Sequence, residues 1–149
     1  MTHEERNNLV SIFVGLFVIG YLSLRIWTKY EAGVFDGPDG LMLWARTVLW
    51  AIPLGVGLMI VALIITTIIH AIVTNNANPS FIVDERDKHI GRYGMIVTMS
   101  VASGGFILGI VFLALGYSAF AVLNIMFYGF AGADFAGNLT KQYLWRRGM

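Results

Sequence analysis

The chain has 149 residues, of which 57% are hydrophobic and only 13% are charged, and its formal net charge is +1. A soluble domain carries about a quarter of its residues charged, so much of this protein's surface must face lipid. The small net charge gives no electrostatic case for nucleic acid binding. The absence of cysteine excludes disulfides, thiolate metal sites and cysteine nucleophiles.

The first apolar segment, at about 9–27, is long enough to cross a hydrocarbon core of ~30 Å as a helix. A cleaved signal peptide is the alternative. However, the leader MTHEERNN has two glutamates against one arginine, and no small-x-small cleavage site follows. We therefore predict an uncleaved first span, followed by an external loop at about 28–48 with Gly and Pro turn chemistry.

The second apolar segment, at 41–73, is too long for a single perpendicular crossing. Arg46 suits the outer interface, where arginine can snorkel. Pro53 would kink the helix or lie in its first turns. We place the crossing at about 49–72, followed by a cytoplasmic loop at about 73–92.

Two more spans are expected at about 93–115 and 118–139, separated only by GYS, which predicts a tight helical hairpin. All spans should be helices, because an unpaired backbone group in lipid costs several kcal/mol. Seven Lys and Arg residues fall on the side of the termini and two on the other, with Arg46 near that second face. The positive-inside rule therefore places both termini in the cytoplasm. The predicted fold is all-α: a polytopic membrane protein with four transmembrane helices in one compact bundle.

The stretch VDERDKHIGR is the densest charge cluster and precedes the third span. Its first acidic residue fits a helix N-cap, and further acids would lie in the first turn, where the helix dipole favours anions. A membrane helix that begins in water on the cytoplasmic side explains this pattern. The functional alternative is a docking or regulatory surface for a protein partner or a neighbouring subunit. Its candidate residues are Asp84, Glu85, Arg86, Asp87 and Lys88.

The motif DERDKHIG between two pairs of spans resembles small bacterial and archaeal membrane proteins with an Asp-Glu-Arg motif in that position, a domain of unknown function. The resemblance covers the motif and the span layout. It implies a multi-pass protein of the prokaryotic cytoplasmic (inner) membrane, with Asp84, Glu85 and Arg86 as the marked positions. It implies no reaction.

Ionisable and amide residues within the spans form a second candidate site, since such residues in membranes are functional hypotheses by default. Asp134 is the best case, and Asn124 and Asn138 lie with it on a loose polar stripe that should face other helices. His70 is expected at a depth similar to Asp134. A contact of Asp134 with His70 or with Arg92 would satisfy the carboxylate. The alternative is a buried structural ion pair or hydrogen bond.

Small residues in the last two spans allow close helix packing. Gly105 and Gly109 form a GxxxG pattern, and Gly129 precedes Ala133 by the same spacing. Such a pattern serves dimerisation or packing within one chain. The short hairpin favours the second use.

Catalytic functions lack the necessary residues. Of three histidines only His70 lies in a span, so paired histidine ligation of haem is not available, and no HExxH, nucleophile-elbow or phosphate-loop pattern occurs. We therefore expect no enzyme, no catalytic residue, no metal site and no cofactor. The leading hypothesis is an accessory, scaffold or regulatory subunit that docks through 84–92 and the C-terminal KQYLWRRG. The alternative is a small oligomeric transporter or channel that uses Asp134, with His70 as a second candidate residue.

Overall fold

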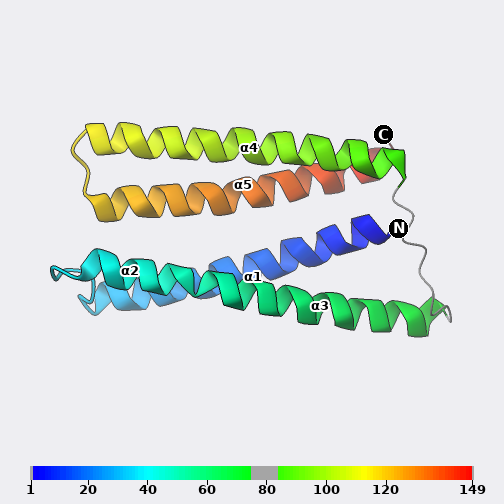
Figure 1. Ribbon diagram of the computed structural model, residues 1–149, viewed down its shortest axis with the longest axis horizontal. Coiled ribbons are helices and arrows are strands. Elements are labelled where there is room, and N and C mark those ends of the chain that lie inside the picture. Colours follow the sequence, from blue (N-terminus) through cyan, green and yellow to red (C-terminus); the bar gives the residue numbers. More distant parts are fainter. Residues whose placement is uncertain (1, 75–83, 149) are drawn as a thin grey trace.

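The computed structural model describes residues 2–74 and 84–148, and every regular element in this part of the chain is a helix (Figure 1). Much of the loop expected at about 73–92 lies at 75–83, outside the described residues. Four helical stretches are long and apolar enough to cross a membrane, with α2 and α3 together forming the second. The predicted all-α fold with four membrane-spanning helices is confirmed. The helices are α1 His3–Glu31, α2 Gly40–Leu49, α3 Ala51–Thr74, α4 Glu85–Ala114 and α5 Ala119–Arg147.

The helices run alongside one another, and both chain ends lie at the same end of the bundle (Figure 1). We call this the terminal end. The opposite end, which carries the connections at 32–39 and 115–118, is called the loop end. The external loop expected at about 28–48 is shorter in the structure, because α1 continues to Glu31 and α2 already begins at Gly40.

The α4 and α5 helices form the most extensive helix–helix contact among the described residues, and glycines allow their backbones to approach closely. A Cβ atom on Gly105 would lie 3.1 Å from Gly129 Cα, so the two backbones nearly touch there. A Cβ on Gly137 would collide with Thr98 Oγ1 and lie 2.8 Å from the Gly94 carbonyl oxygen. The small residues of these spans therefore pack the two helices of one chain against each other.

The turn between α4 and α5 is closed by local backbone chemistry. Gly116 has a φ of 85°, a conformation that favours glycine. Ser118 caps α5, because its hydroxyl oxygen accepts a hydrogen bond from the Ala121 N–H at 3.3 Å. The sequence GYS thus forms the tight hairpin that its length predicted.

The second span is interrupted between α2 and α3. Leu49 ends α2 and Ala51 begins α3, with Trp50 between them. Pro53 has no N–H, so it cannot donate to the Leu49 carbonyl four residues earlier, and the helical hydrogen-bond ladder is broken at this point. The proline therefore lies in the first turn of α3 rather than in the middle of a continuous helix.

Aromatic packing fixes the loop end. Ile26, Phe35 and Trp44 form a buried cluster. The Phe35 ring lies 5.3 Å from that of Phe120 on α5, and the Trp44 indole N–H donates to Asn124 Oδ1 at 3.1 Å. These contacts tie α2 and the connection before it to α1 and α5.

The α3 helix presents an exposed apolar surface along its whole length. No residue of this helix is buried, and its isoleucines at 60, 64 and 68 are each more than half exposed. A helix that is apolar on all sides requires an apolar surrounding. The lipid bilayer supplies that surrounding.

Candidate functional site

Three amide side chains form a buried hydrogen-bonded ladder between α1 and α5. Asn8 Nδ2 donates to the main-chain carbonyl oxygen of Asn138 at 2.9 Å and to Gln142 Oε1 at 3.5 Å. Gln142 Nε2 in turn donates to Glu5 Oε1 at 3.2 Å. All three amides are at least nine-tenths buried. Because buried polar groups are costly unless paired, these bonds fix how the first helix meets the last.

Asp134 continues this ladder toward the middle of α5. Asn138 Nδ2 donates to Asp134 Oδ2 at 3.1 Å, while Lys141 Nζ donates to Asn138 Oδ1 at 2.8 Å. The amide thus lies between a carboxylate and an ammonium group. Asp134 is about 20 Å from the end of α5 at Arg147, at ~1.5 Å per residue. It is therefore a carboxylate near the middle of a membrane-spanning helix.

An open cleft between α1, α3 and α5 exposes Asp134. Its volume is about 570 Å³. Its walls are mostly apolar, with Ser11, Asp134 and Asn138 as the polar lining. The Ser11 hydroxyl lies 3.9 Å from Met59 Sδ on α3. A carboxylate at this depth is expensive in lipid, so the cleft is the natural place for a polar ligand, water or a partner side chain.

His70 does not lie with Asp134. Met59 and Asp134 line the same cleft, and His70 lies about 16 Å further along α3, at ~1.5 Å per residue. Arg92 also makes no ion pair with the carboxylate. The expected depth match was wrong because α3 runs well past the level of Asp134 toward the terminal end, and Asn138 supplies the partner instead.

Asn124, from the predicted polar stripe, and Tyr128, one turn further along α5, both contact other helices. Asn124 accepts from Trp44 on α2. The Tyr128 hydroxyl donates to Ser23 Oγ on α1 at 2.9 Å. These residues join α5 to the first half of the chain. Asn124 does not line the cleft and lies ten residues before Asp134 on α5. They form structural cross-links rather than one continuous site.

The charged segment at the start of α4 is divided between two roles. Asp87 is buried, and Trp145 Nε1 donates to its Oδ1 at 2.7 Å. Arg86 Nη2 donates to the Trp145 carbonyl oxygen at 3.1 Å. Asp84 takes the N-cap position with extended backbone, although its side chain makes no capping hydrogen bond. Arg86 and Asp87 thus join the start of α4 to the end of α5.

The other ionisable side chains at the start of α4 are exposed. We call them the outward cluster, which consists of Glu85, Lys88, His89 and Arg92. These side chains surround a depression of about 190 Å³. Among the described residues, none of them has a hydrogen-bond or ion-pair partner for its side chain. Two of the predicted docking residues, Glu85 and Lys88, are therefore available for contacts.

Sequence reasoning missed the partners that complete both sites. Asn8 lies before the apolar run of the first span, and Gln142 lies beyond the expected end of the last. Gln142 follows Asn138 by one helical turn, which was the available signal. The hydrogen bond of Trp145 with Asp87 joins residues far apart in the chain, and no local sequence pattern predicts it.

The fold and its exposed apolar surface define a multi-pass membrane protein. No protein-family model, no curated protein and no solved structure matches the chain. The resemblance to membrane proteins with an Asp-Glu-Arg motif therefore stays a prediction.

Proposed function

We propose that this protein is a non-enzymatic accessory, scaffold or regulatory subunit of the prokaryotic cytoplasmic membrane, which acts through contacts with another protein. The outward cluster carries the proposal. Arg86 and Asp87 serve the fold through Trp145, whereas the outward cluster presents both signs of charge without partners among the described residues.

The composition of the outward cluster favours a protein partner. Basic residues alone would serve to orient the membrane protein. An interleaved carboxylate adds nothing to that role, but it suits a partner with a complementary charge pattern, because such patterns give specificity and register. The terminal end also carries most of the Lys and Arg residues, which supports placing it in the cytoplasm.

Native mass spectrometry of the tagged protein, extracted gently from its own membranes, tests the proposal. We expect a stoichiometric foreign subunit with the wild-type chain and its loss from the double variant Glu85→Lys/Lys88→Glu, which keeps the net charge. A matched exchange at the exposed loop-end residues, Glu31→Lys/Arg46→Glu, should retain the subunit. A wild-type chain without a foreign subunit, or a subunit that survives the Glu85/Lys88 exchange, contradicts the proposal.

A second candidate function is a small oligomeric transporter or channel, which the position of Asp134 in the cleft favours. Asp134→Asn removes the charge but keeps an oxygen that accepts from Asn138, so the fold should persist. If the protein transports protons or ions, this variant abolishes flux in reconstituted vesicles, while Asp36→Asn in the exposed loop does not. Unchanged flux in Asp134→Asn vesicles excludes this function for the carboxylate.

A further inference from the structure

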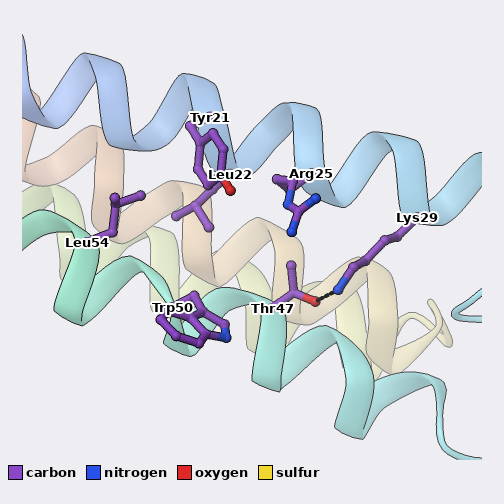
Figure 2. A pocket seen from close by; sticks show the side chains of 7 residues that line it. All are labelled: Tyr21, Leu22, Arg25, Lys29, Thr47, Trp50 and Leu54. Carbon is purple, nitrogen blue, oxygen red and sulfur yellow. Dashed lines mark hydrogen bonds between the residues drawn. The ribbon is translucent and has the colours of Figure 1, made fainter.

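A pocket at the loop end lies between α1 and the junction of α2 with α3 (Figure 2). Its volume is about 400 Å³, within the range of small-molecule sites of roughly 300–1,000 Å³. Arg25 and Lys29 project from α1 toward Thr47 and Trp50 on the opposite wall (Figure 2). We call it the loop-end pocket.

The two cations of the pocket are held in place without an acidic partner. Lys29 Nζ donates to Thr47 Oγ1 at 2.8 Å. The Arg25 guanidinium lies 5.8 Å from the centre of the Tyr21 ring, a cation–π distance. Among the described residues neither cation pairs with a carboxylate, although Glu31 belongs to the same helix. The pocket therefore carries two uncompensated positive charges one helical turn apart.

The surroundings of the pocket place it at a membrane interface. Trp27, Tyr30 and Trp50 are all more than half exposed near the loop end. Exposed tryptophan and tyrosine side chains settle at the level of the lipid headgroups. From this level the pocket continues along Leu22 and Leu54 toward the hydrocarbon core. Its cationic part thus lies among headgroups and its apolar part among acyl chains.

We propose that the loop-end pocket binds one anionic phospholipid. The phosphate accepts hydrogen bonds from Arg25 and from Lys29, whose ammonium has donors left beside its bond to Thr47. The start of an acyl chain lies along Leu22 and Leu54. The site consists of the charges and the apolar wall of the pocket, so it can bind lipid on whichever side of the membrane the loop end lies.

Native mass spectrometry in mild detergent, with added phosphatidylglycerol, tests the site. We expect one lipid to remain on the wild-type chain and its affinity to fall about tenfold or more in Arg25→Gln/Lys29→Gln, because charge-assisted hydrogen bonds are lost. Arg46→Gln removes an equal charge at the same end but outside the pocket, so it should change the affinity less than about twofold. Glycerol phosphate, which has the anionic head without acyl chains, should bind at least about tenfold more weakly, because it buries no apolar area.

The proposal would be overturned by an undiminished affinity in the double variant, by an equal loss in Arg46→Gln, or by equal binding of glycerol phosphate, which would mean that the ligand is a soluble anion. Circular dichroism checks the fold of each variant. If the double variant unfolds, Arg25→Gln at the exposed position carries the test alone, with Arg25→Lys expected to retain binding. Phosphatidylcholine that binds as tightly as phosphatidylglycerol would also contradict a site built for net negative charge.

Discussion

Replacement of Gly137 by alanine is expected to force α4 and α5 apart. The added methyl would collide with Thr98 Oγ1, which a rotation can relieve, and would lie 2.8 Å from the Gly94 carbonyl oxygen, which cannot rotate away. Ordinary contacts begin at 3.4 Å, so the two backbones must separate. Overpacking of this kind costs about 1–3 kcal/mol, against a gain of up to about 1 kcal/mol from the better helix propensity of alanine.

Gly132→Ala is the matched control, because it lies on the same helix with nothing within 4 Å of its Cβ position. It should show only the propensity gain, which both variants share, so the two are expected to differ by the overpacking cost of about 1–3 kcal/mol. Reversible unfolding in mixed micelles with increasing SDS, followed by circular dichroism, measures this difference. Thr98→Ala in the Gly137→Ala background should recover part of the loss but not all. Equal stability of the two alanine variants would refute the close approach of the helices.

The same unfolding measurement checks three further changes. Gly40→Ala should destabilise the protein, since its methyl would collide with a carbonyl oxygen of the loop-end turn, whereas Gly37→Ala meets open space and should have no effect. Trp145→Phe removes the N–H that Asp87 accepts and should cost about 1–3 kcal/mol, because a buried carboxylate loses its partner. Asn8→Ala breaks two buried hydrogen bonds between α1 and α5 and should cost about 1–2 kcal/mol; unchanged stability would show that the amide ladder contributes nothing.

The sequence by itself determined the class of protein and the number of spans. Long apolar segments can only be helices in lipid, because each backbone group must find its partner within the segment. The hairpin between the last two spans also followed from chain length, since GYS leaves no room for anything else. The interruption of the second span before Pro53 was also predictable from the sequence, because the missing N–H of proline is a local property.

Only the tertiary structure decided which polar residues share a site. Hydrogen bonds such as Asn8 with Asn138, or Trp145 with Asp87, join residues from opposite parts of the chain, and their register depends on how far each helix extends past its neighbour. Because of this offset, His70 lies away from Asp134, whereas Arg25 and Lys29 point toward Thr47. Helical periodicity fixes the face on which a residue lies, but the level at which two helices meet is fixed by packing between them.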